Sequence, residues 1–184
     1  METTFVIPIL LLLAFGIVEL GNAWDSKLKV ETAARAGARV GSGLGADRLA
    51  DYNLLESVKA GLSEVGLSNV EYVVVFNANA ADGAVPAGCV GSPPTSQTGS
   101  CNVYTAEQLE NLTEAQFTGT TDCDTSAPDH WWCPTSREDV QSAGADYVGV
   151  WIKARSPNLT QLFGSGFDVR SSAVMRIEPT GATP

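Results

Sequence analysis

FVIPILLLLAFGIV, residues 5–18, contains no polar side chain and decides the fold of this chain. A helix over this run is apolar on every side, as a helix in a membrane or in the core of an assembly is. The run is shorter than the roughly 20 residues of a comfortable span, although Leu20, Ala23 and Trp24 extend it. We therefore expect a marginal membrane span, which suits a segment that later leaves the membrane.

A secretory signal peptide is the main alternative for this run. Such a peptide begins with Lys or Arg and ends at a cleavage site of small residues. No Lys or Arg precedes Lys27, and large apolar residues recur at four-residue steps: Leu20, Trp24 and Leu28. This spacing is that of one helix face, so we predict a single continuous helix over about residues 3–40. Glycines follow at the expected end of the helix: Gly41, Gly43 and Gly45.

Composition and charge restrict the remaining classes of protein. Of the 184 residues 44% are hydrophobic, so the chain can bury a core. About 140 to 160 residues remain after the apolar run, the size of one ordinary domain. The formal net charge of −10 opposes the counterion release that drives nucleic-acid binding. We predict no nucleic-acid partner, and we expect any membrane attachment to come from apolar insertion.

The four cysteines, Cys89, Cys101, Cys123 and Cys133, lie in the polar middle of the chain. An even number fits two disulfides in an oxidising compartment, outside the cytoplasm. A four-thiolate zinc site is less favoured because the spacings contain no Cys-x2-Cys or Cys-x4-Cys pair. Of the three connectivities, we favour Cys89 with Cys101 and Cys123 with Cys133, because each closes a short loop.

The charges beside the apolar run bear on its orientation. The first positive residues follow the run: Lys27, Lys29, Arg35 and Arg39. The positive-inside rule alone would place the rest of the chain in the cytoplasm, whereas the cysteines place it outside. Both observations fit if a basic leader preceded residue 1 and was removed after insertion. We state that leader as a hypothesis.

The N-terminal segment resembles the start of TadE-like pilins of the tight-adherence (Tad) systems. The resemblance is carried by METTFVIPILLLLAFGIVELGNAW and by ETAARAGARVG, within residues 2–41, where the acid, the proline and the glycines keep their spacing. It continues weakly in SSAVMRIEP, which looks like the closing strand of the family. The resemblance implies membrane insertion, cleavage by a prepilin peptidase, contact with the secretion and assembly machinery, and polymerisation with copies of itself or other pilins into an extracellular filament.

Five residues of the segment are candidates for setting assembly and register. Glu2 lies at the edge of the apolar helix, where pairing with an N-terminal amine would fix axial register, or where it rests at the lipid interface near the helix N-terminus. Pro8, Gly16 and Gly21 weaken the helix and favour a kink or local melting, or are simply tolerated in a membrane. Glu19 is expected at the membrane interface.

The remaining sequence predicts an α+β, type IV pilin-like fold with a helix packed on a small antiparallel sheet. A second helix is expected over residues 47–65, with Asp47 as N-cap and Gly66 as stop. Strands are expected over residues 70–76, 147–154 and 169–177. Short helices are expected near 106–112 and, from Ser156 and Pro157, over 156–164. Residues 77–144 form a disulfide-stapled loop region, so residues 1–45 are the membrane or filament-core helix and 46–184 the head.

Motifs for catalysis or cofactors are not evident. His130 is the sole histidine, and a Cys-His nucleophile pair would need a free thiol. No P-loop, dinucleotide fingerprint or Gly-x-Ser-x-Gly elbow occurs. We therefore expect neither enzymatic activity nor a cofactor or metal.

Three weaker patterns favour a structural interpretation. Trp131 and Trp132 could form a binding platform, but packing over the disulfide and sheet is favoured. The acids Asp122, Asp124 and Asp129 lack the EF-hand pattern and are expected to be solvated. Asn111 and Asn158 match the short glycosylation acceptor motif.

These observations support two classes of function. The favoured one is a structural subunit of a pilus-like filament that assembles through its N-terminal helix and displays the head. The alternative is a monomeric, membrane-anchored binding module outside the cytoplasm.

Overall fold

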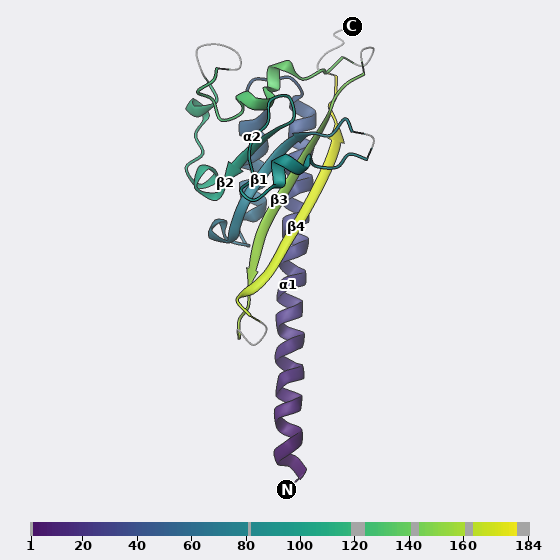
Figure 1. Ribbon diagram of the computed structural model, residues 1–184, viewed down its shortest axis with the longest axis vertical. Coiled ribbons are helices and arrows are strands. Elements are labelled where there is room, and N and C mark those ends of the chain that lie inside the picture. The colour runs from purple at the N-terminus through teal and green to yellow at the C-terminus, as the bar shows by residue number, and fades with distance from the viewer. Residues whose placement is uncertain (1, 81, 119–123, 141–143, 161–163, 180–184) are drawn as a thin grey trace.

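The computed structural model describes residues 2–80, 82–118, 124–140, 144–160 and 164–179, with the side chains of the first helix described from Val6 onward (Figure 1). A single helix, α1 (Glu2–Leu44), runs through 43 residues, about 65 Å at 1.5 Å per residue. Pro8 lies inside it, and Gly45, with φ 57°, follows its end. The predicted continuous helix is confirmed; it runs past Gly41 and Gly43 and ends before Gly45.

The C-terminal half of α1 packs closely on α2 (Ala50–Leu62). Small residues permit this approach: a Cβ added at Gly61 would lie 2.9 Å from Cα of Ala33, and one added at Gly37 would lie 2.4 Å from Cγ2 of Val58. Small residues on both helices, such as Ala33 of α1 and Gly61 of α2, therefore form a close contact within the chain. The second helix is shorter than predicted, with Leu49 as N-cap. Asp47, the predicted N-cap, instead accepts a hydrogen bond from the Leu49 N–H in the turn before the helix.

A four-stranded antiparallel sheet in the order β2-β1-β3-β4 lies against the helices (Figure 1). Its strands are β1 (Val70–Asn77), β2 (Cys101–Thr105), β3 (Tyr147–Pro157) and β4 (Gly166–Arg176). Three of them were predicted, and the α+β, pilin-like architecture is confirmed. β2 was missed because its five residues lie in a polar, glycine-rich stretch and form a strand only through pairing with β1.

Both faces of β1 are buried, so the head has two apolar clusters. Val73 and Val75 belong to the larger cluster, which α1 and α2 cover. Tyr72, Val74 and Phe76 belong to the second cluster on the opposite face, together with the disulfide-bonded cysteines. The loop region therefore acts as a second layer over the sheet.

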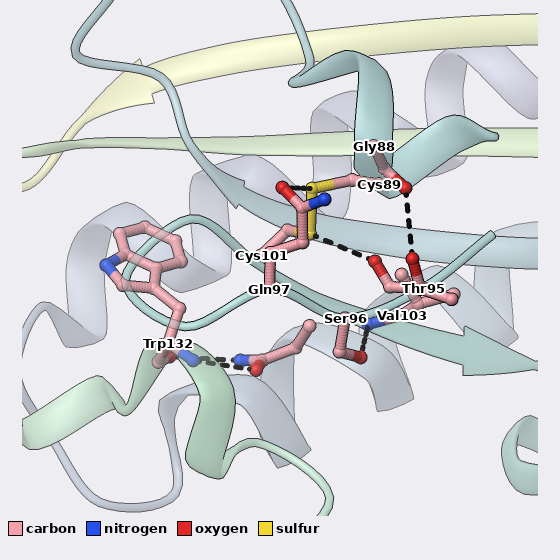
Figure 2. Close-up of a disulfide and its surroundings, with 9 residues drawn as sticks. Gly88, Cys89, Thr95, Ser96, Gln97, Cys101, Val103 and Trp132 are labelled. Carbon is pink, nitrogen blue, oxygen red and sulfur yellow. Dashed lines mark hydrogen bonds between the residues drawn. A yellow bond between two sulfur atoms is a disulfide. The ribbon is translucent and has the colours of Figure 1, made fainter.

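Cys89 and Cys101 form a disulfide that anchors this layer, the first of the two pairings that the sequence favoured (Figure 2). Both residues are fully buried. Beside them, the Thr95 hydroxyl donates to the Gly88 carbonyl over 3.3 Å. Cys133 is also disulfide-bonded. Cys123, its predicted partner, lies outside the described residues, so that pairing stays a prediction.

The β3–β4 hairpin replaces a helix that the sequence predicted over residues 156–164. Ser156 and Pro157 lie in β3, paired with Phe167 and Gly166, and residues 158–160 are not helical. That prediction is wrong for the described residues, because Pro and Gly suit the end of a hairpin as well as a helix. The short helix α3 (Ala106–Glu110) is present as expected, with a capping box from Thr105.

Candidate functional site

The first half of α1 is an apolar rod with exposed sides. Its large side chains from Val6 to Val18 are all exposed, from 42% at Phe15 to 72% at Ile17. Figure 1 shows this half projecting away from the head. By length and composition α1 is able to cross a membrane, with a most apolar stretch of mean hydropathy 2.1. The predicted apolar segment therefore carries most of the exposed large apolar side chains of the described chain.

The predicted register residues follow one another along this rod. Glu2 is the first residue of α1, and its side chain is outside the description. Pro8 lies among exposed residues and Gly16 is half-buried. A Cβ added at Gly21 would have no neighbour within 4 Å among the described residues. Their roles in assembly stay predictions.

Glu19 is bound by its own chain at the level where the rod meets the hairpin. Its carboxylate accepts hydrogen bonds from the Leu159 N–H (3.0 Å), the Thr160 N–H (2.6 Å) and the Thr160 hydroxyl (2.7 Å). Glu19 is only 2% exposed. The sequence placed this acid at the membrane interface, and local patterns could not have shown its partners, about 140 residues away along the chain.

Further contacts fasten the hairpin along α1 above Glu19. The Ser26 and Ser156 hydroxyls lie 3.1 Å apart, and the Lys27 ammonium donates to the Arg170 carbonyl. An open groove of about 620 Å³ lies between the helix and the hairpin. Leu20, Ala23, Trp24, Lys27 and residues 167–170 line it. Hairpin and helix thus form one continuous, partly apolar surface.

A buried polar cluster in the head was missed at the sequence level. Asp51 of α2 and Arg137 of the loop region have fully buried side chains and form an ion pair of 2.6 Å. The second Asp51 oxygen accepts hydrogen bonds from the Asn102 amide and the Tyr104 hydroxyl, each 2.9 Å long. Asp51 occurs with Leu54, Leu55 and Val58 at i, i+3, i+4 and i+7, and this spacing could have predicted its burial.

Trp132 completes this cluster. Its indole lies under the Arg137 guanidinium, with Cζ 4.1 Å from the ring centroid. Its backbone N–H donates to Asn102 Oδ1 over 2.9 Å. Arg137 Nε and Nη1 are buried without a hydrogen-bond partner among the described residues. The cluster links α2, β2 and the loop region, so its arrangement is that of a structural clamp.

Asp129 lies near this clamp and departs from the predicted solvated state. It is 5% exposed. Burial, reinforced by the negative charge of Asp51, raises the pKa of Asp129 to about 7. Asp124 caps a local turn through Ser126, and Asp122 lies outside the described residues. No cluster of three potential metal ligands occurs within the described ranges.

The remaining candidates take separate positions. Trp132 packs in the core as predicted, whereas Trp131 is 40% exposed beside His130, at a ring distance of 4.6 Å. The Asn111 amide donates to the Glu107 carbonyl, and the Asn158 amide donates to the Gly164 carbonyl. Glycosylation of either asparagine stays a prediction.

Comparison with known families adds one match. Residues 1–39 match the family model described as "TadE: TadE-like protein". This confirms the resemblance over most of α1. No curated protein and no solved structure matched the chain significantly.

Proposed function

We propose that this chain, with its TadE-like N-terminal segment, is a structural subunit of a pilus-like filament. It is inserted in the membrane through α1 before assembly, and the head faces the outside. It then packs α1 against copies of itself or other pilins, and the filament displays the head at the cell surface.

One observation carries this proposal. The same unbroken helix is exposed and apolar over its first half and is built into the head core over its second half. Leaving such a rod in water is costly, so lipid or other rods must cover it. Because the helix is continuous, docking of the rod also positions the head.

A structural role, and not an enzymatic one, is part of the proposal. The Cys89 and Cys101 thiols are consumed in a disulfide. The His130 imidazole bonds the Ala127 carbonyl over 2.5 Å. The buried Asp51–Arg137 pair is enclosed and serves packing. These arrangements support a display head.

Electron microscopy of material sheared from cells that produce the chain naturally tests the proposal. We expect filaments whose map contains the head and a core of α1 helices. The anchored-module alternative predicts monomers in detergent at every concentration and no filament that labels with antibody to the head. That second result would overturn the proposal.

A further inference from the structure

The apolar run of α1 is too short to cross the hydrocarbon layer alone. Residues 5–18 span about 21 Å at 1.5 Å per residue, against about 30 Å for the hydrocarbon core. The missing 9 Å or so corresponds to about six further residues, which reaches Trp24. Trp is favoured at the membrane interface, and Trp24 is 66% exposed. A full span therefore runs from the start of the run to Trp24.

This placement puts Glu19 about 7.5 Å deeper than Trp24. A carboxylate at such a depth is costly unless its oxygens are hydrogen-bonded. Three donors from Leu159 and Thr160 bind it, and Glu19 is almost completely buried. The donors belong to the β3–β4 hairpin, which runs down beside α1 toward the N-terminus (Figure 1). The depth of Glu19 therefore also fixes the depth of these residues.

The surface around the hairpin end has the order of side chains that a membrane interface favours. Leu159 is 68% exposed and Leu20 is 67% exposed. Phe167, farther along β4, is 38% exposed, and Lys27 and Arg170 follow toward the head. Apolar and aromatic residues lie nearest the hairpin end, and charged residues, Asp168 as well as the two basic ones, follow toward the head, which is the direction from acyl chains to head groups.

We propose that the end of the β3–β4 hairpin, residues 157–160, is a second membrane contact, immersed at the outer edge of the hydrocarbon layer together with Glu19. Leu159 contacts the lipid acyl chains, and the hairpin supplies the hydrogen bonds that make Glu19 tolerable there. The contact fixes the insertion depth and the tilt of the head before assembly. A neighbouring subunit is less favoured as the occupant, because Glu19 is already satisfied within its own chain.

Spin labels on the full chain test this contact, which rests on the membrane-inserted stage of the proposed function. Single variants Leu13→Cys, Leu159→Cys and Val140→Cys are labelled without reductant, so that the disulfides stay intact. They are then reconstituted in phosphatidylcholine–phosphatidylglycerol vesicles. The ratio of oxygen to nickel-complex accessibility should be highest at position 13 and lowest at position 140. At position 159 we expect a ratio several-fold above that at 140.

The outcomes separate the two proposals. A water-like ratio at 159 with an immersed label at 13 overturns the second contact and leaves the proposed function intact. A water-like label at 13 overturns membrane insertion itself. A label at 159 that is water-like in vesicles but protected in filaments would assign the hairpin end to a second copy of the chain, against our proposal. Glu19→Gln, which replaces one acceptor oxygen by a donor, should lower the ratio at 159 and leave that at 13 unchanged.

Discussion

The two halves of α1 differ in side-chain size: the exposed half carries the large apolar residues and the buried half carries small ones. The exposed half carries large residues such as Leu10, Leu13 and Phe15, whereas the buried half carries Ala33, Ala34 and Ala38. Small residues let the buried half lie close to α2, so the head core forms within one chain. Large residues leave the other half with an apolar area that nothing in the described chain covers. One helix thus separates the half that builds the head core from the half to which the proposed function assigns insertion and assembly.

If that separation holds, breaking the buried Asp51–Arg137 ion pair should destabilise the head more than any other change predicted below. Arg137→Met leaves the Asp51 charge buried without its cation, which should lower the free energy of unfolding by roughly 3–5 kcal/mol. Urea unfolding of the detergent-solubilised chain, followed by near-UV circular dichroism, measures this. Membrane insertion should be unchanged.

The exposed pair Arg170–Asp168 provides a control for this effect. Its side chains are 60% and 45% exposed, so Arg170→Met should change the unfolding free energy by less than about 0.5 kcal/mol. The double variant Asp51→Leu/Arg137→Met should lose less than the sum of its single variants. Equal losses for Arg137→Met and Arg170→Met would show that the buried pair is not a clamp.

The same Gly→Val change should lower the stability of the head in the buried half of α1 and leave it unchanged in the exposed half. Gly37→Val overlaps Val58 of α2 and should cost the head about 2–3 kcal/mol. Gly21→Val has the same change in helix propensity, but an added Cβ meets no described atom within 4 Å. Its head should unfold at the wild-type urea concentration in the same assay. Because Gly→Val raises helix propensity at both positions, a similar loss in both variants would show that the contact with α2 is not its cause.

Local patterns predicted the elements well and their long-range partners poorly. The α1 helix, the second helix and three strands follow from periodicity and from Gly and Pro positions. β2 needs β1 to exist, and Pro157 is compatible with a hairpin as well as a helix start. The partners of Glu19 are distant in sequence, so no local signal identifies them.

The candidate site divides in the same way. The apolar run and its family likeness could be found from residues 1–39, because covering an apolar rod needs no tertiary detail. The spacing of Asp51 on the apolar face of α2 could have predicted its burial, but the clamp could not be found, because the partners Asn102 and Arg137 are distant in the sequence.

A smaller effect is expected from pH. Unfolded Asp129 titrates near its ordinary pKa of 3.8, and the folded protein raises that pKa to about 7. The protonated form is therefore favoured by folding, and its stabilisation is complete below about pH 4 and is lost as pH rises to about 7. Between pH 4 and 7 we expect the free energy of unfolding to fall by about 2 kcal/mol, after allowing for solvent screening.

Asp129→Asn should remove this slope in urea unfolding curves between pH 4 and 7. Asp168→Asn, at an exposed carboxylate, should retain it. An unchanged slope in Asp129→Asn would locate the responsible group elsewhere. Insertion through the exposed half of α1 should not follow this titration.

The smallest effect on the head, and a large one on assembly, is expected for Glu2→Gln. If neighbouring helices stack with staggered N-termini in a dry filament core, an unpaired carboxylate there would cost several kcal/mol, so its pairing with an amine should decide how subunits dock. Gln keeps the shape and hydrogen-bonding capacity but not the charge. We expect a folded, disulfide-bonded head, normal membrane insertion and few or no filaments by electron microscopy.

Glu19→Gln is the matched control, because its partners lie within the same chain, and it should give a milder defect. Wild-type filament yield from Glu2→Gln, together with loss of filaments from Glu19→Gln, would assign register to the acid at the hairpin and not to the acid at the helix start.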